Sequence, residues 1–339
     1  RARALAGVLR LGITAGLREA GGTVVTADVE PGRVVSAITR VAALVATGSR
    51  LDAGYHELPL RAGDRVAART VCAHAPDAVV LLGAHTRLPL GTRYVSVLDM
   101  TLPQAHIHHP VFARLGEPVY RSWLTRQREI LKAAHRVAAA SEWAASSVVD
   151  DLGIDESRVE VLGLGSNHVA VTADSREWSR PHFLFIGREW ERKGGPALLK
   201  AFAAVRARAP EATLDLVGGH PPLSAPGVIG HGLLALDDPA GREQVRELLS
   251  RATCLVLPSQ LEPFGIVHCE ALAAGIPSIG TTVGGPATII GPDAGALVEP
   301  GDHEALVAAM LSYCDPETAR TAGTAAAARA PWFTWPAVG

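Results

Sequence analysis

Short apolar runs rich in β-branched residues alternate along the chain with longer stretches whose apolar positions recur at helical spacing. This alternation is typical of parallel strands joined by crossover helices, so it predicts an α/β fold. In the first half, strands are expected at residues 23–29, 78–83, 94–98, 137–140 and 159–162. Helices are expected near residues 4–20, 64–74, 121–134 and 144–152.

The second half repeats the alternation, with strands expected at residues 183–186, 213–217, 254–257, 277–280 and 296–298. Its helices are expected near residues 196–208, 242–250, 269–274 and 304–312. Between the halves, residues 163–182 are small or polar and show no helical period, so they predict a linker. Because α/β proteins bind ligands beyond the carboxyl ends of their parallel strands, two such sheets joined by a linker predict a ligand-binding cleft between two domains.

Composition narrows the class of protein. Of 339 residues, 48% are hydrophobic and 19% are charged, which suits two apolar cores and excludes a disordered chain. The net charge of −2 supplies no overall field for nucleic acid, so no nucleic-acid partner is expected. Apolar stretches fall short of the ~18 residues of a spanning helix, no signal-peptide pattern opens the chain, and the four cysteines stand far apart. A reducing, cytoplasmic location is expected.

The first candidate for chemistry directly follows the expected strand 183–186. Residues 187–195 read Gly-Arg-Glu-Trp-Glu-Arg-Lys-Gly-Gly, and Pro196 then stands at a favoured first helical position. Glycines before a helix amino terminus form an anion site, to which Arg188 and Lys193 can add a guanidinium and an ammonium for a phosphate group. The alternative is a solvated basic loop without function.

A second candidate follows the expected strand 254–257. Glu262 and Glu270 stand on either side of a Phe-Gly-Ile turn that exposes backbone N–H groups where the next helix starts. We place Glu270 in the first helical turn, where a carboxylate can accept hydrogen bonds from hydroxyl groups. Taken singly, Glu270 could merely complement the helix dipole, and Glu262 could be an exposed loop acid before a proline.

Together the two segments resemble the carboxyl-terminal domain of the retaining GT-B glycosyltransferases, in particular glycosyltransferase family 4 (glycosyl transferases group 1). That family has a GRxxxxKG stretch, matched by residues 187–194, and two glutamates around a PFG(I/L/V) core, matched by Glu262 and Glu270. The following residues are similar to its EAxAxGxPV continuation, with Ser278 in place of the valine. The resemblance spans about residues 183–310. It implies two Rossmann-like parallel-sheet domains facing each other across a cleft, which is the GT-B fold.

Further along, residues 283–285 and 295–298 stand where the family has a GG turn and a GxLV strand. The family's first strand with its Gly-rich turn, and its last helix, do not appear, so both ends look clipped. The resemblance therefore implies an acceptor-side Rossmann-like domain, a linker, a nucleotide-sugar-binding domain and the start of a truncated cross-over segment, at residues 1–165, 166–182, 183–331 and 332–339.

The resemblance also implies a role for each matched residue. Arg188 and Lys193 would bind the donor diphosphate and neutralise the leaving group, and Glu262 would bind hydroxyls of the donor sugar; these three are the expected catalytic residues. Glu270 would hold the ribose hydroxyls. The residues expected to bind the nucleotide sugar are Arg188, Lys193, Gly218, Phe264, Gly265, Ile266, Val267 and Glu270.

The amino-terminal half is less similar to the family. Its members often carry a His-Asp pair after a strand of the first domain; here Asp99 is present, but Leu98 stands in the His place. Asp99 and His106 are the expected acceptor-side residues, with His106 as a substitute for the family histidine; the alternative is a surface histidine in a proline-bounded loop. The nearby histidines lack a spaced carboxylate or cysteine partner, so no metal site is expected.

The function implied by the resemblance is that of a retaining, metal-independent glycosyltransferase of the hexosyltransferase type. No cofactor is expected; the donor would be a UDP-sugar or GDP-sugar and the acceptor a small soluble molecule or a glycan. The alternatives are a sugar-nucleotide epimerase or another GT-B enzyme, a transferase acting on a lipid-linked acceptor, and a non-catalytic nucleotide-sugar binder.

A basic helix bears on the lipid alternative, because basic helices can contact anionic membranes. We expect a solvated face instead, so membrane association is not favoured. The basic residues of this helix are Arg121, Arg126, Arg128, Lys132 and Arg136.

Overall fold

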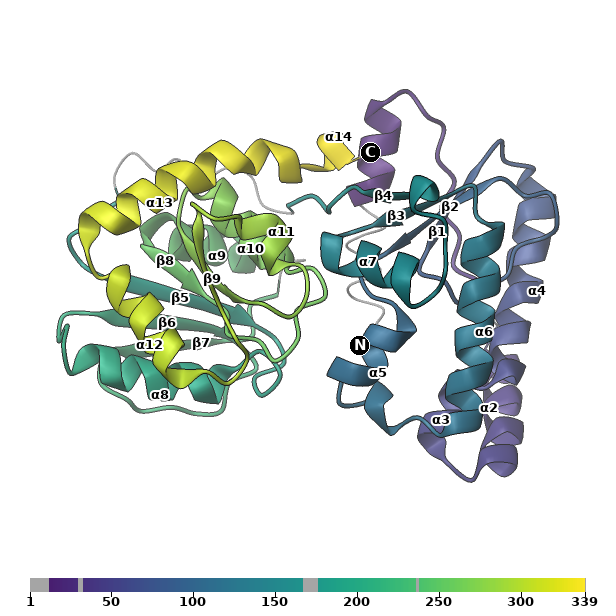
Figure 1. Ribbon diagram of the computed structural model, residues 1–339, viewed down its shortest axis with the longest axis horizontal. Helices are drawn as coiled ribbons and strands as arrows, with labels where there is room; N and C mark the ends of the chain where they lie inside the picture. The colour runs from purple at the N-terminus through teal and green to yellow at the C-terminus, as the bar shows by residue number, and fades with distance from the viewer. Residues whose placement is uncertain (1–11, 30–32, 167–175, 236–237, 339) are drawn as a thin grey trace. The chain divides into compact units, whose positions relative to one another are not determined.

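The computed structural model describes residues 12–29, 33–166, 176–235 and 238–338. The described chain divides into two compact units: unit 1 lies within residues 23–162, and unit 2 combines residues 12–22 with those from 163 onward. Each unit contains its own all-parallel sheet with helices packed on it (Figure 1). The predicted α/β class with two parallel-sheet domains is confirmed.

The sheet of unit 1 has the strand order β1-β2-β3-β4, and each of its strands overlaps a predicted one. The strands are β1 (Val79–Leu82), β2 (Tyr94–Leu98), β3 (Arg136–Ala139) and β4 (Val159–Val161). The helices are α2 (Arg33–Thr47), α3 (Arg50–Tyr55), α4 (Glu57–His74), α5 (Leu102–His108), α6 (Glu117–Ala133) and α7 (Glu142–Asp150), with the 3-10 turns η1 (Phe112–Arg114) and η2 (Glu156–Arg158).

The predicted strand at residues 23–29 is wrong. Residues 22–29 have no regular structure and pair with no strand of the described chain, and Val25 is 61% exposed. Residues such as valine and threonine favour a strand only where a neighbouring strand pairs with the backbone and one face is buried. The helix expected at residues 4–20 is observed at 12–19, and its earlier part lies outside the described residues.

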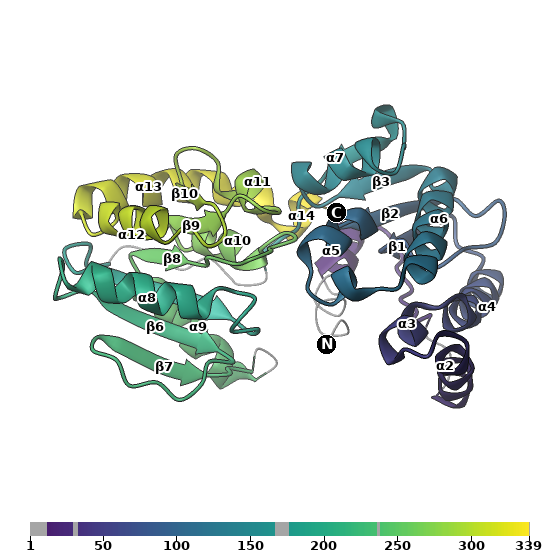
Figure 2. The same cartoon turned by 60° about the horizontal axis from the view of Figure 1, so that its bottom comes forward.

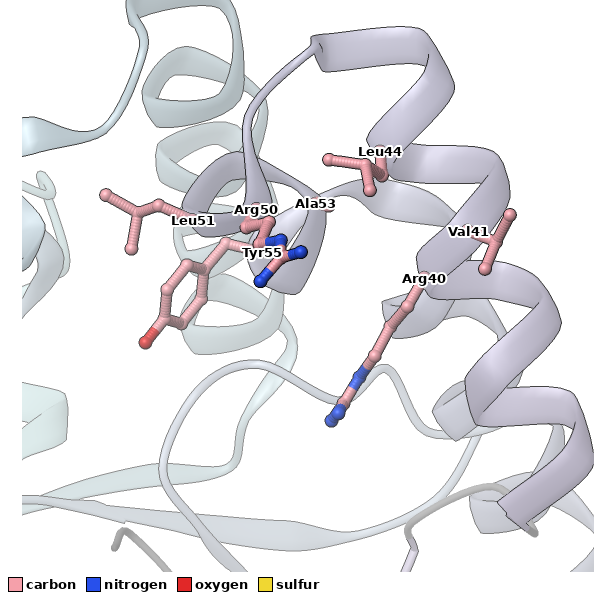
Figure 3. A pocket seen from close by; sticks show the side chains of 7 residues that line it. All are labelled: Arg40, Val41, Leu44, Arg50, Leu51, Ala53 and Tyr55. Carbon is pink, nitrogen blue, oxygen red and sulfur yellow. The ribbon is translucent and has the colours of Figure 1, made fainter.

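Helix α2, which the sequence interpretation missed, presents apolar side chains to solvent. Val34, Ile38, Val41 and Val45 recur at helical spacing, and Val41, the least exposed of them, is still 62% exposed. Beside this stripe, an open hollow lies between α2 and α3 (Figure 3). No residue predicted to carry chemistry lines it. Its lining consists of Arg40, Val41, Leu44, Arg50, Leu51, Ala53 and Tyr55.

The expected solvated basic face on α6 needs a correction at Arg126. This side chain is fully buried; its Nε donates to the His85 carbonyl oxygen at 2.8 Å and its Nη1 donates to Glu57 Oε2 at 3.1 Å. Its Nη2 also forms an ion pair with Asp64. Because a buried guanidinium needs such partners, Arg126 holds α4 and α6 together and faces neither solvent nor a membrane.

The sheet of unit 2 has the order β10-β9-β8-β5-β6-β7, and all its pairs are parallel. Its strands are β5 (His182–Gly187), β6 (Thr213–Gly218), β7 (Val228–Gly232), β8 (Cys254–Val256), β9 (Ser278–Thr281) and β10 (Gly295–Val298), of which β7 was not predicted. Its helices are α8 (Gly195–Arg206), α9 (Pro239–Arg251), α10 (Ile266–Ala273), α11 (Pro286–Ile290), α12 (His303–Ser312), α13 (Pro316–Arg329) and α14 (Trp335–Val338), with the 3-10 turn η3 (Ala330–Phe333).

Both faces of this sheet are buried. Phe183 and Phe185 of β5 pack with α8 and α12, which lie side by side (Figure 2), whereas Leu184 packs with α9 and α10 on the other face. A strand covered on both faces needs a continuous apolar run, and this is why β5 reads Phe-Leu-Phe-Ile. The sheet is a rigid base for the loops that leave its carboxyl edge.

Candidate functional site

The loops after β5 and β6 touch at the carboxyl edge of the unit 2 sheet. A Cβ atom on Gly218 would stand 1.8 Å from the Gly187 carbonyl oxygen, and one on Gly219 would stand 2.5 Å from that of Arg188. Gly218 also has a φ of +135°, which residues with side chains rarely adopt. Glycine is therefore required at both positions, and its lack of a side chain allows the loop after β6 to lie against the backbone at Arg188.

The loop after β5 also packs on the loop after β8. Gly194, with a φ of +76°, caps α8, and a Cβ there would stand 2.0 Å from the Pro258 carbonyl oxygen. Arg192 joins the two loops: its carbonyl oxygen accepts from the Gln260 N–H at 2.8 Å, and its Nη1 donates to the Leu261 carbonyl oxygen at 2.7 Å. These contacts hold Lys193 next to Glu262.

Lys193 and Glu262 form a buried ion pair, although they stand 69 positions apart. Their side chains are 15% and 7% exposed, and Ser259 Oγ donates to Glu262 Oε2 at 3.2 Å. Burial alone would raise the pKa of Glu262, but the Lys193 ammonium outweighs it and holds this pKa below its usual value. Burial lowers the pKa of Lys193, and Glu262 opposes this only in part. We take both groups as charged.

Arg188 differs from Lys193 in that it is exposed and forms no ion pair with any residue the structure describes. Its guanidinium stands at the start of the loop whose end carries the buried ammonium of Lys193. The edge of the sheet thus offers one exposed and one buried cation, which suits an anion that arrives from solvent.

The backbone of Glu262 is fixed by the loop after β9. The Glu262 N–H donates to the Val283 carbonyl oxygen at 3.3 Å, and the Gly285 N–H donates to the Glu262 carbonyl oxygen at 2.9 Å. A Cβ on Gly284 would stand 1.9 Å from that same oxygen. The GG turn of the sequence is therefore needed so that two loops can meet at Glu262.

The Phe-Gly-Ile turn begins α10 as expected. Gly265, with a φ of +98°, is its N-cap, and the helix starts at Ile266, so the first N–H groups face the turn without intrahelical partners. The Phe264 side chain is 3% exposed and lies 6.4 Å, between ring centroids, from Phe333. The Phe264 side chain is therefore part of the core.

Glu270 does not lie in the first helical turn, so that prediction is wrong. Because α10 already starts at Ile266, Glu270 stands in the second turn and is 6% exposed. Burial raises the pKa of its carboxyl group to about 8. A carboxyl group held this close to neutral can donate or accept a hydrogen bond, which suits a hydroxyl partner.

Sequence reasoning missed His268, which lies in the same helix. It is fully buried, its Nδ1 lies 2.5 Å from Ser278 Oγ, and its Nε2 has no hydrogen-bond partner among the described residues. Burial lowers its pKa to about 4, so the ring is neutral near pH 7. The one available signal was Ser278, a polar residue at the position where the family pattern has a valine.

A second missed group surrounds Asp215 of β6, whose side chain is 1% exposed. His231 Nε2 lies 2.6 Å from Asp215 Oδ1, Arg251 Nη2 lies 2.7 Å from Oδ2, and His182 also contacts Oδ2. Burial works against the charge, but these partners hold the pKa of Asp215 down at about 2. The group joins β5, β6, β7 and α9, so we assign it to the fold of unit 2.

The predicted acceptor-side residues lie in unit 1. Asp99 directly follows β2, and His106 lies on α5, where its Nδ1 is 3.0 Å from the Phe112 carbonyl oxygen and its ring is 4.3 Å from that of Tyr120. Their predicted roles stay predictions. Among the described residues, no three His, Cys, Asp or Glu side chains converge as a metal site, and no helix is long and apolar enough to cross a membrane.

Comparison with known proteins identifies the family of a domain in unit 2. Residues 180–315 match the family described as Glycosyl transferases group 1, and so unit 2 contains a domain of that family. The chain is 31% identical over 297 residues to a D-inositol 3-phosphate glycosyltransferase of Streptomyces scabiei, and 28% identical to one of Streptomyces avermitilis. Each match covers 77% of this chain, but the chain spans only 66% and 64% of these relatives.

Solved structures show the fold. A sucrose-phosphate synthase from Thermosynechococcus elongatus matches with a TM-score of 0.64 and 22% identity, over 83% of this chain and 75% of that one. WaaG, a glycosyltransferase involved in lipopolysaccharide biosynthesis, matches with a TM-score of 0.61 and 18% identity, over 82% and 80%. These neighbours confirm the GT-B fold that the motifs implied.

Proposed function

We propose that this chain is a retaining glycosyltransferase that moves a sugar from a nucleotide-diphosphate sugar, with UDP or GDP as the nucleotide, to a hydroxyl group of a small soluble acceptor. The observation that carries the proposal is the buried Lys193–Glu262 ion pair at the carboxyl edge of the unit 2 sheet, with the exposed Arg188 in the same loop as Lys193. The buried Glu270 lies in α10, the helix that follows the Glu262 loop. Two cations and two buried carboxyl groups match the phosphates and hydroxyls of such a donor.

In the proposed chemistry, some residues neutralise the charge of the leaving diphosphate and others orient the donor. Glycosyl transfer passes through an oxocarbenium-like transition state while negative charge builds on the leaving diphosphate. Arg188 and Lys193 neutralise this charge, and the first N–H groups of α10 add donors at a helix amino terminus. Glu262 orients hydroxyls of the donor sugar and Glu270 those of the ribose.

Retention of configuration is part of the proposal, with attack by the acceptor hydroxyl on the face that the diphosphate leaves. The hydroxyl proton passes to the departing diphosphate, so no protein nucleophile is required. Asp99 and His106 are proposed on the acceptor side. Relatives named for D-inositol 3-phosphate support a small polyhydroxylated acceptor, such as a cyclitol.

The test combines donor binding with product analysis. A thermal-shift screen of UDP- and GDP-sugars selects the donor, and mass spectrometry and NMR then identify the product and its anomeric configuration. We expect Glu262→Gln to lower turnover at least ~100-fold, because a contact near the reacting carbon is lost. Glu191→Gln, an exposed acid in the loop after β5, is the matched control and should act as wild type. An inverted product would refute the retaining mechanism.

The same experiment separates the alternatives. An epimerase would convert labelled nucleotide sugar without any acceptor, and a lipid-acting transferase would label only the organic extract. A non-catalytic binder would bind donor and form no product with any acceptor. Each of these results would replace the proposed activity with another reading of the same site.

A further inference from the structure

His268 lies directly beneath the turn that begins α10. A Cβ placed on Gly265 would stand 2.7 Å from His268 Cδ2 and 3.5 Å from its Nε2, and 3.0 Å from Glu262 Cγ. The unpartnered ring nitrogen and the Glu262 side chain therefore border the same point of the turn. No other described residue supplies a hydrogen-bond partner to this nitrogen.

A buried nitrogen without a hydrogen-bond partner destabilises the fold, so its presence suggests a function. A buried polar group without a partner loses its hydrogen bonds to water and gains nothing in return. Among the described residues, the ring has one hydrogen-bond partner, Ser278, through Nδ1 at 2.5 Å, and Ser278 stands where the family pattern has an apolar residue. An apolar pair would fill the same space without the unsatisfied nitrogen, so the two residues need an explanation.

Lys193 explains why this nitrogen is kept, because its ammonium group has two possible partners. In the structure its ammonium is paired with Glu262, whereas the proposed function requires it at the donor diphosphate. When Lys193 moves to the phosphates, Glu262 would become a buried carboxylate that has lost its cation. Apart from the hydroxyl groups of the donor sugar, which carry no charge, Ser259 Oγ at 3.2 Å would be the one partner left to its carboxylate among the described residues.

We infer that His268 is a positioning residue which takes over from Lys193: when the donor draws the ammonium to its diphosphate, the His268 Nε2–H donates to the Glu262 carboxylate. The inference requires the tautomer with its proton on Nε2, and it therefore assigns the Ser278 hydroxyl as the donor to Nδ1. The inference rests on the proposed function, since it assigns a second partner to the same carboxylate.

The decisive variant replaces the pair by apolar residues, His268→Leu with Ser278→Val. Removing an unpartnered core group should leave the melting temperature equal to wild type or higher. Affinity for the nucleotide sugar, measured by calorimetry with UDP-glucose and GDP-mannose, should fall at least tenfold, because opening the Lys193–Glu262 pair would strand the carboxylate. Thr281→Val is the matched control, since Thr281 Oγ1 in β9 is also buried without a partner. It should bind the donor as wild type does.

A second measurement uses the unaltered protein. In wild type labelled with ¹³C and ¹⁵N, the His268 ring signals, assigned through the backbone of that residue, should report a proton on Nε2 in the free protein. Addition of the donor should shift that proton downfield as it binds Glu262. A proton on Nδ1, or no shift on saturation, overturns the inference even if the variant does not fold.

The possible failures are distinguishable. If wild type binds neither UDP-glucose nor GDP-mannose nor any other nucleotide sugar, both the proposed function and this inference are wrong. If wild type binds a donor and the double variant binds it equally well, the inference alone is wrong. If the Thr281→Val control loses as much affinity as the double variant, the effect is one of packing and the inference is overturned.

Discussion

Lys193 and Glu262 illustrate how much the site depends on single side chains. Lys193→Ala should lower the free energy of unfolding by about 3–5 kcal/mol, because it leaves Glu262 as a buried charge without its cation. Turnover should fall roughly thirty- to several-hundred-fold through the lost phosphate contact. Lys200→Ala, an exposed lysine of α8, is the control. Denaturant unfolding and steady-state kinetics check both effects, and a wild-type unfolding curve for Lys193→Ala would contradict the buried pair.

Asp215 gives a prediction about acid stability. Its pKa in the folded protein, about 2, lies below the unfolded value of 3.8, so its ionised form stabilises the fold above the unfolded pKa. This contribution, on the order of 2 kcal/mol, should disappear as the pH falls from about 4 to 2. Asp215→Asn should lose it at neutral pH and show a flatter pH dependence. Urea unfolding from pH 2 to 7 measures the difference, and parallel curves would refute the assignment.

For Glu270 the stability of the fold is expected to depend on pH in the opposite direction. Burial raises its folded pKa to about 8, above the usual 4.5, so the fold favours the protonated form and its stability falls as the pH rises between these values. Glu270→Gln, which mimics the neutral acid, should therefore gain stability over wild type by about 1–3 kcal/mol at pH 8.5 and little at pH 4.5. Nucleotide affinity should stay within about threefold of wild type, because the amide can still donate to and accept from a hydroxyl group. Equal stability differences at both pH values would contradict the raised pKa.

The sequence allowed some of these residues to be identified but not the contacts between them. The spacing of Arg188, Lys193, Glu262 and Glu270 could be compared with a family pattern, because each motif lies within one short stretch of the chain. The Lys193–Glu262 pair could not be foreseen, since it depends on how two separate loops pack. The sequence around His268 does not mark it as functional, because a single histidine in an apolar helix cannot be distinguished by sequence from a histidine that only fills the core.

At the level of elements, the glycines at the carboxyl edge of the unit 2 sheet set the distances between loops. Gly218→Ala should destabilise the protein by about 2–5 kcal/mol, because its Cβ would overlap the Gly187 carbonyl oxygen and its φ of +135° disfavours side chains. Gly301→Ala is the matched control, with a φ of +87° but open space around it, and should cost only about 1–2 kcal/mol. Thermal unfolding measures both, and equal losses would mean that the close contact is absent.

The elements differ in how well their sequences predicted them. Strands β5 and β8 are buried on both faces, so their continuous apolar runs are strong signals. Strand β6 was predicted as well, although Asp215 interrupts its apolar run. Strand β7 is a short edge strand with two glycines, and its pattern is weak for that reason. At residues 23–29 a strand was predicted where none is observed, because valines and threonines do not form a strand unless a neighbouring strand pairs with them.

On the scale of the whole molecule, the two units have separate hydrophobic cores. In unit 1 the core gathers around Ile130, Leu131 and Val137, and in unit 2 it lies on both faces of the larger sheet. A unit with its own core can unfold cooperatively by itself. All residues proposed to bind the donor belong to unit 2, so a donor should stabilise the two units unequally.

Differential scanning calorimetry of the full chain should therefore resolve two transitions. A nucleotide sugar at about a hundred times its dissociation constant contributes about 2.7 kcal/mol to the unit that binds it, which corresponds to roughly 5–10 °C for a unit of this size. Only one transition should move, and Lys193→Ala should strongly reduce that movement, because the variant removes one of the two side-chain cations proposed to bind the phosphates in unit 2. A donor that raised both transitions equally would mean that unit 1 supplies as much of the binding energy as unit 2, against the assignment of the donor to the loops around Lys193 and Glu262.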